Sequence, residues 1–189
     1  MTFRLRVAFL RKNGVNPLEH KSLAPVNLKD DESYSSKLGL IKNYLTTKKK
    51  YYKEIFENCK SNKTEYSGKY KLLKLDDDKK DIYDKITLDF FDFLKHIEAL
   101  TPGTDDDLPP WIILLPDGDV KTARKYLHYK YGTGNAPPLQ SHHVTLDYNN
   151  SIPNKIVNHS DINIIFESIV IYTTNLAGEL IDEVWTSPF

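Results

Sequence analysis

Phe3-Arg4-Leu5-Arg6-Val7-Ala8-Phe9-Leu10 is the clearest strand pattern in the chain, and it sets the expected fold class. Every second residue from Phe3 to Phe9 is large and apolar, and both arginines fall on the opposite face. This period of two is typical of a β-strand with one buried side. The last third of the chain predicts three more strands, at 142–148, 162–172 and 180–186. We expect these segments to form a mostly antiparallel sheet, which the first strand joins.

Between about residues 31 and 100 the apolar residues recur in steps of three and four, as on a helix. Leu38, Ile41 and Leu45 begin this pattern. A second helix is expected after Asp76-Asp77-Asp78, since acidic side chains favour the free N–H groups at a helix start. A cation site is the alternative interpretation of this acidic run. The sequence therefore predicts an α+β fold, with a helical middle region packed on the sheet.

The length of 189 residues suits a single domain, 1–189. Within it we expect a mainly helical segment at 31–100 and a C-terminal sheet region at 111–189. That region opens with a buried apolar strand at 111–115, followed by a short helix at about 120–131.

Two stretches are expected to be irregular. Residues up to about 30 contain Pro17 and Pro25 and are predicted to form an ordered loop. Residues 62–69 are predicted to be a polar loop, leading to a short strand at 70–75.

Composition narrows the class of protein. Lys plus Arg and Asp plus Glu each number 26, so the basic excess of a general nucleic-acid scaffold is missing. The one cysteine, Cys59, permits no intramolecular disulfide and no multi-cysteine zinc site. We expect Cys59 to pack at a helix end. The sequence shows no signal peptide and no stretch of 18 apolar residues, so a cytoplasmic location without membrane contact is expected.

The segment Ser141-His142-His143-Val144-Thr145-Leu146 has the strongest chemical signal. On a strand, His143, Thr145 and Asp147 share one face, and the residues between them face the core. A histidine near neutral pKa exchanges protons, and a hydroxyl two residues on can hold a phosphate oxygen. An ordinary surface strand that contains histidine and threonine is the alternative.

His143-Val144-Thr145-Leu146 resembles the His-x-Thr-hydrophobic motif of the 2H phosphoesterases, a family that includes cyclic nucleotide phosphodiesterases. The resemblance covers residues 142–186. It implies that two such motifs face each other on strands, that each histidine is a general acid or base, and that each hydroxyl binds phosphate. It also implies a 2′,3′-cyclic phosphate, a 2′-5′ linkage or a related RNA or nucleotide end as substrate, with no metal or other cofactor.

The best second motif is His20-Lys21-Ser22, which satisfies His-x-Ser. It lies between two prolines without an apolar alternation, which disfavours a strand there. If His20 is not the partner of His143, the protein is a one-histidine relative of the family. The predicted catalytic residues are thus His143, Thr145, His20 and Ser22.

Substrate contacts are expected from Arg124, Lys125 and Tyr148. The two cations lie on the predicted helix at 120–131, where an ordinary solvated face is the alternative. The rival to a phosphoesterase is a non-enzymatic interaction protein, of pathogen or phage type, that binds a protein partner. An enzyme should place His143 and Thr145 in a concave cleft, with a second histidine within reach. An interaction protein should leave them on a flat face, with an exposed aromatic patch elsewhere.

Overall fold

A computed structural model describes residues 2–99, 142–175 and 177–189. The β-strands are β1 (Thr2–Arg11), β2 (His20–Lys29), β3 (Cys59–Ser67), β4 (Tyr70–Lys74), β5 (His143–Asp147), β6 (Lys155–Ile164), β7 (Phe166–Thr174) and β8 (Leu180–Pro188). The helices are α1 (Tyr34–Ile55), a short 3-10 helix, η1 (Asp77–Lys79), and α2 (Lys80–His96). The predicted α+β class is confirmed, with a mostly antiparallel sheet.

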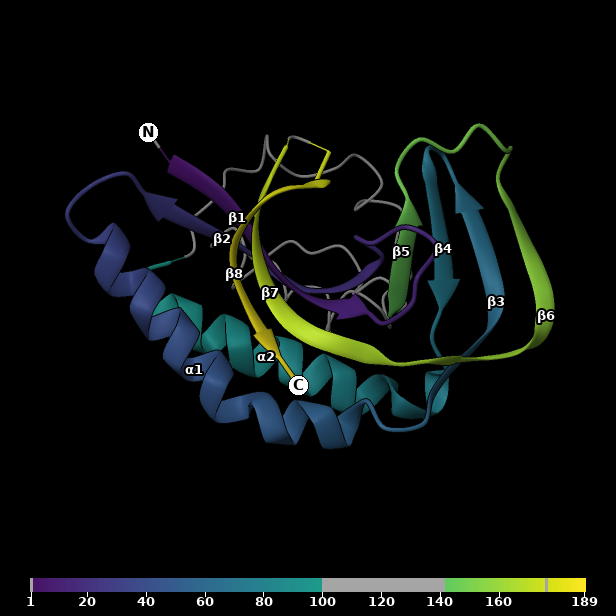
Figure 1. The fold of residues 1–189 in the computed structure, drawn as a ribbon, viewed down its shortest axis with the longest axis horizontal. Coiled ribbons are helices and arrows are strands. Elements are labelled where there is room, and N and C mark those ends of the chain that lie inside the picture. The colour runs from purple at the N-terminus through teal and green to yellow at the C-terminus, as the bar shows by residue number, and fades with distance from the viewer. Residues whose placement is uncertain (1, 100–141, 176) are drawn as a thin grey trace, which may run out of the picture.

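The strands form a single antiparallel sheet in the order β6-β3-β4-β5-β2-β1-β7-β8. Its centre is unusual, because β2 and β5 share just the register pair His20–Thr145. The sheet therefore consists of two four-stranded halves, β6-β3-β4-β5 and β2-β1-β7-β8, that meet at this point. Figure 1 shows β3, β4, β5 and β6 grouped on one side of the molecule and β1, β2, β7 and β8 on the other.

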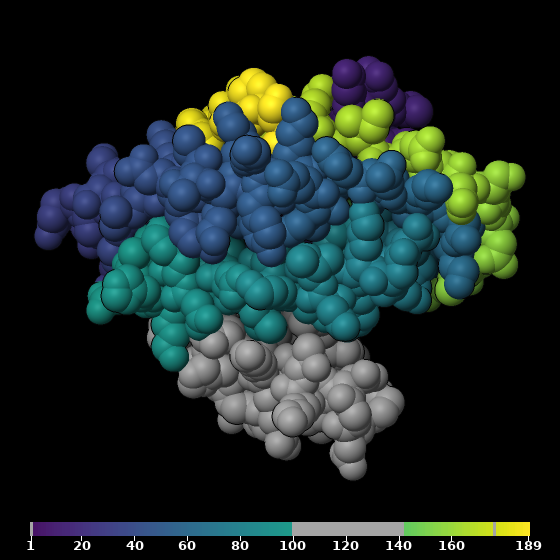
Figure 2. Space-filling view, turned by 90° about the horizontal axis from the view of Figure 1, so that it is seen from below, coloured from purple at the N-terminus to yellow at the C-terminus, as the bar shows by residue number. Residues whose placement is uncertain are grey.

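Both helices lie along one face of the sheet (Figure 1), and seen from that side they cover most of it (Figure 2). Helix α1 buries Leu38, Ile41, Leu45 and Tyr52, which lie on one face at helical spacing. Strand β1 meets this layer with the apolar residues of its alternating pattern, such as Phe9, which packs edge-on against Tyr52 at 5.5 Å between ring centroids. The helix side of the sheet therefore holds the main core.

The opposite face of the sheet is less apolar. A small cluster of Ala8, Leu10, Val170 and Leu180 packs there. Beside it the face carries the polar side chains of β1, β2 and β5, and these include the predicted site residues.

The prediction of an ordered loop up to residue 30 is wrong for 20–29, which form β2. Pro25 is tolerated because its backbone nitrogen faces away from β1. The N–H of Asn27, two residues on, donates to Ala99 O at 3.1 Å, so N–H groups on this side of β2 point away from β1. The missing N–H of Pro25 thus costs no hydrogen bond to β1.

Within the segment predicted to be mainly helical, 31–100, the hairpin β3–β4 separates α1 from α2, and β4 is the short strand expected at 70–75. Most of the predicted polar loop at 62–69 belongs to β3, and Cys59 begins that strand instead of ending a helix. Strand β6 was not expected over Lys155–Ile164, since its residues alternate weakly and are mostly exposed. The predicted strand at 111–115 and helix at 120–131 lie outside the described residues.

Candidate active site

Strand β2 begins with His20 and carries Ser22 on the same face. Lys21, between them, points to the helix side, where its Nζ lies 5.4 Å from the centroid of the Tyr83 ring. His20 is almost fully buried, with 1% of its surface exposed. The predicted His-x-Ser segment therefore lies on a strand, with its histidine and its hydroxyl on the face opposite the helices.

Strand β5 begins in the same way, with His143, and places Thr145 two residues later. Val144, between them, is buried in the main core on the helix side, so His143 and Thr145 lie on the opposite face. Thr145 is the direct register partner of His20 across the two strands. Since the strands are antiparallel, the two His-x-hydroxyl segments run side by side in opposite directions on one face.

Arg6 of β1 extends this group. Its Nη1 donates a hydrogen bond of 2.8 Å to Ser22 Oγ. Its Nε is buried without a hydrogen-bond partner. A Cβ atom at Gly178 would lie 3.0 Å from Arg6 Nη2, so the glycine lets the chain pass close to the guanidinium. The site thus contains a cation beside a hydroxyl, which is a good environment for an anion.

His20 is a neutral imidazole in this environment. Burial is the main cause that lowers the pKa of His20 to about 4; the hydrogen bond with Leu18 O opposes this shift, and the nearby charges of Arg6 and His143 add to it. The Nδ1 of His20 lies 2.8 Å from that carbonyl oxygen and must donate to it. The proton on Nδ1 leaves Nε2 with a lone pair, so Nε2 is a proton acceptor.

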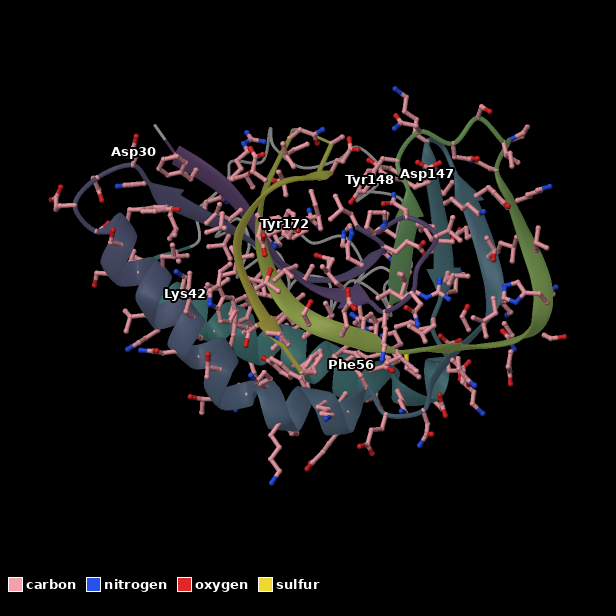
Figure 3. All side chains as sticks on the ribbon, in the orientation of Figure 1. Asp30, Lys42, Phe56, Asp147, Tyr148 and Tyr172 are labelled. Atoms are coloured by element: carbon pink, nitrogen blue, oxygen red, sulfur yellow. The ribbon has the colours of Figure 1, made fainter. Side chains whose placement is uncertain are left out.

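Tyr148, which follows β5 (labelled in Figure 3), covers this acceptor. Its ring is parallel to that of His20, with centroids 6.2 Å apart. Its hydroxyl donates to Gly178 O at 3.0 Å and lies 3.4 Å from His20 Nε2. Burial raises the pKa of Tyr148, and the hydroxyl of Thr145 lies close enough to act in the other direction. Tyr70 packs edge-on against Tyr148 at 5.4 Å.

The structure thus brings together five of the residues expected from the sequence: His20, Ser22, His143, Thr145 and Tyr148. Arg124 and Lys125 lie outside the described residues. Asp147, which was expected on the face of His143, accepts a hydrogen bond of 3.0 Å from the N–H of Asn149 and so shapes the turn after β5.

Sequence reasoning missed Arg6 and Tyr70 as site residues. The alternation of β1 did place Arg6 on the polar face. However, its position beside Ser22 follows from the pairing of β1 with β2, which that pattern does not specify.

In the described ranges no three His, Cys, Asp or Glu side chains gather closely enough to hold a metal ion. No helix in these ranges is long and apolar enough to cross a membrane. The site therefore consists of two histidines, two hydroxyls, an arginine and two tyrosines, on an antiparallel sheet backed by two helices. No family model matches the chain, and no curated protein matches it.

Proposed function

We propose that the protein is a metal-independent phosphoesterase that acts on a cyclic or 2′-5′-linked nucleotide or RNA end. The observation that carries this proposal is the register pair His20–Thr145. It sets a His-x-Ser and a His-x-Thr segment side by side, on one face of the sheet. Two histidines and two hydroxyls are a sufficient set for phosphodiester hydrolysis, because one histidine accepts a proton while the other donates one.

His20 is the general base. Its tautomer is fixed by the hydrogen bond to Leu18 O, so the lone pair of Nε2 is ready to accept a proton. Because His20 is buried, the attacking water reaches it through the Tyr148 hydroxyl, which lies 3.4 Å from Nε2. Tyr148 therefore relays the proton: its O–H turns from Gly178 O to Nε2, passes its proton to His20 and takes one from the water.

His143 is the general acid. As the water oxygen forms its bond to phosphorus, the bond from phosphorus to the leaving oxygen breaks, and His143 donates a proton to that oxygen. The proton taken by His20 and the proton given by His143 balance, so the enzyme returns to its starting state by exchanging them with solvent.

Arg6, Ser22 and Thr145 hold the phosphate. The guanidinium offers charged donors beside the Ser22 hydroxyl. The hydroxyls lie on the two neighbouring strands, so a phosphate between them contacts both halves of the sheet. Donors fixed in place before the reaction stabilise the charge that develops on the phosphate oxygens.

The test is hydrolysis of 2′,3′-cyclic AMP, 2′-5′ oligoadenylate and cyclic dinucleotides in the presence of EDTA. We expect turnover with at least one of them, and a loss of about a hundredfold or more in His20→Asn and His143→Asn. His159→Asn is the control, since His159 lies on edge strand β6, where its Nε2 is 2.9 Å from Thr64 Oγ1.

A wild-type protein that hydrolyses none of these compounds, and whose Tm no nucleotide raises, would overturn the proposal. That result would favour the interaction-protein alternative.

A further inference from the structure

The helix side of β2 and β5 carries a chain of charged and polar side chains, directly behind the candidate site. Lys21 Nζ donates to His142 Nδ1 at 3.0 Å. His142 Nε2 donates to Asp84 Oδ1 at 2.6 Å, and Lys80 Nζ donates to Asp84 Oδ2 at 2.8 Å. We infer that Lys21, His142 and Asp84 form a clamp that fixes β2 against β5, and thereby positions the two His-x-hydroxyl segments. The catalytic meaning of the clamp rests on the proposed function.

The clamp residues are sequence neighbours of the site residues. Lys21 lies between His20 and Ser22, and His142 immediately precedes His143. Successive side chains of a strand point to opposite faces, so each clamp contact on the helix side is matched by a site residue on the other. Any shift of β2 along β5 would break the contact between Lys21 and His142 and misalign the site at the same time.

This junction needs a side-chain contact because its backbone pairing is minimal. Strands β1 and β2 share nine register pairs, whereas β2 and β5 share one, His20–Thr145. A single pair specifies the relative position of two strands weakly. The bond from Lys21 to His142 crosses this junction, and Asp84 ties it to α2.

The charges in the clamp are arranged to support one another. Burial lowers the pKa of Lys21 to about 8, and the nearby carboxylate of Asp84 opposes this shift. Burial alone would raise the pKa of Asp84, but hydrogen bonds from His142 and Lys80 hold it below its ordinary value. Burial lowers the pKa of His142, which favours the neutral ring that accepts from Lys21 and donates to Asp84.

Packing against the Tyr83 ring also helps to hold the clamp residues in place. The His142 ring meets the Tyr83 ring edge-on at 5.2 Å, and Lys21 Nζ lies over the same ring. Lys21 has 2% of its surface exposed and the His142 side chain 9%. Buried charge networks that are fully hydrogen-bonded can fix one arrangement of the backbone, at the cost of desolvation.

The chain offers a matched pair of substitutions for the test. Asp84 and Asp89 both lie on α2, and each accepts a hydrogen bond of 2.8 Å from the lysine four residues earlier. Just one of them, Asp84, also accepts from His142. We therefore compare Asp84→Asn with Asp89→Asn. Lys21→Met is a second clamp variant, which keeps the apolar stem and removes the buried charge, so the fold should tolerate it.

Two measurements are made on the full chain: amide hydrogen exchange in β2 and β5, and kcat and KM for a nucleotide that the wild type hydrolyses. We expect Asp84→Asn and Lys21→Met to speed exchange in both strands by about tenfold, as for the loss of a hydrogen bond to a charged group. We expect kcat to fall by about tenfold or more, because the two histidines lose their alignment, and KM to rise as well, because Ser22 and Thr145 hold the phosphate from the two strands that the clamp joins. Asp89→Asn should change neither measurement.

The two proposals fail in different ways. If the wild type has no turnover but exchange still rises in Asp84→Asn alone, the phosphoesterase proposal is overturned and the clamp stands. If exchange in β2 and β5 is the same in Asp84→Asn, Lys21→Met and Asp89→Asn, the clamp is overturned whatever the activity.

Discussion

Arg6 donates a hydrogen bond of 2.8 Å to the hydroxyl of Ser22, on the neighbouring strand of the sheet. No carboxylate in the described part of the chain lies within ion-pair distance of Arg6. The charge of the guanidinium is therefore not neutralised by a carboxylate of these residues, and the hydrogen bond from Nη1 holds it beside Ser22. We expect Arg6→Lys to raise KM for the substrate by about tenfold, since lysine lacks the planar fork that grips a phosphate.

The control for this change is Arg4→Lys, on the same face of β1 but exposed. Calorimetry with inorganic phosphate checks binding independently of turnover. Equal affinities in wild type and Arg6→Lys would remove Arg6 from the phosphate site.

A substitution at Gly178 also tests the role of the Arg6 guanidinium, because Gly178 lies next to it. Its φ is +85°, and a Cβ there would lie 3.0 Å from Arg6 Nη2. Gly68 has a φ of +62° with nothing within 4 Å of such a Cβ, so it is a matched control. We expect both Gly178→Ala and Gly68→Ala to lower the free energy of unfolding by about 1 kcal/mol, from backbone strain.

The two glycine variants should differ in function. Gly178→Ala alone should weaken phosphate binding, by about tenfold, because the methyl group displaces Arg6 from its bond to Ser22. Denaturant unfolding and phosphate titration of both variants make the comparison. A similar loss of binding in Gly68→Ala would mean that general strain, and not Arg6, is responsible.

Tyr148→Phe isolates the proposed proton relay. The substitution keeps the ring parallel to His20 and removes the hydroxyl that lies 3.4 Å from Nε2. We expect kcat to fall by about a hundredfold, because water must then reach a buried imidazole directly, and KM to stay within about threefold.

The loss of the bond from Tyr148 to Gly178 O should cost about 1 kcal/mol of stability. Tyr34→Phe is the control, since Tyr34 lies at the start of α1 and packs against Phe3, away from the candidate site. An equal kcat in wild type and Tyr148→Phe would argue against the relay.

The buried His20 should make the protein sensitive to acid. Its pKa is about 4 in the folded protein and 6.5 without the fold. Between these values the unfolded chain binds a proton that the folded chain does not, so the free energy of unfolding falls as the pH drops from 6.5 to 4. The loss approaches about 3 kcal/mol at the lower end, and it does not grow further below pH 4.

Urea unfolding at several pH values measures this slope for His20. In His20→Gln the slope over that window should be smaller, whereas His96→Gln, an exposed residue at the end of α2, should retain it. A slope unchanged in His20→Gln would show that another group causes it.

The sequence patterns predicted those elements that bury one regular face. Strand β1 alternates, and α1 and α2 repeat their apolar residues at helical spacing, so each reveals both its type and its core side. Strands β3 and β6 did not, because β6 is an edge strand with mostly exposed residues and β3 pairs with it. Pro25 concealed β2, since a proline predicts a break unless it lies at an unpaired strand edge.

The residues of the candidate site also differ in how far the sequence predicts their positions. The shared face of His143 and Thr145 follows from the period of two, which is a local property. The proximity of His20, Arg6 and Tyr148 depends on the pairing of strands far apart in the sequence. A motif match suggested His20, but no local pattern specifies that it lies opposite Thr145.

The path of the chain through the two half-sheets governs the order in which the protein can mature during synthesis. β1 and β2, with His20, emerge early, but their half-sheet is completed by β7 and β8, which begin at Phe166 and Leu180. The other half, β3 to β6, is made in the interval and is contiguous apart from the segment before β5. A ribosome must therefore translate past residue 174 before β1 can pair on both sides, and past residue 188 before the outer strand β8 is complete. Until then the nascent chain contains both His-x-hydroxyl motifs without the complete sheet that aligns them. We therefore expect the proposed activity to appear only after the last strand has formed.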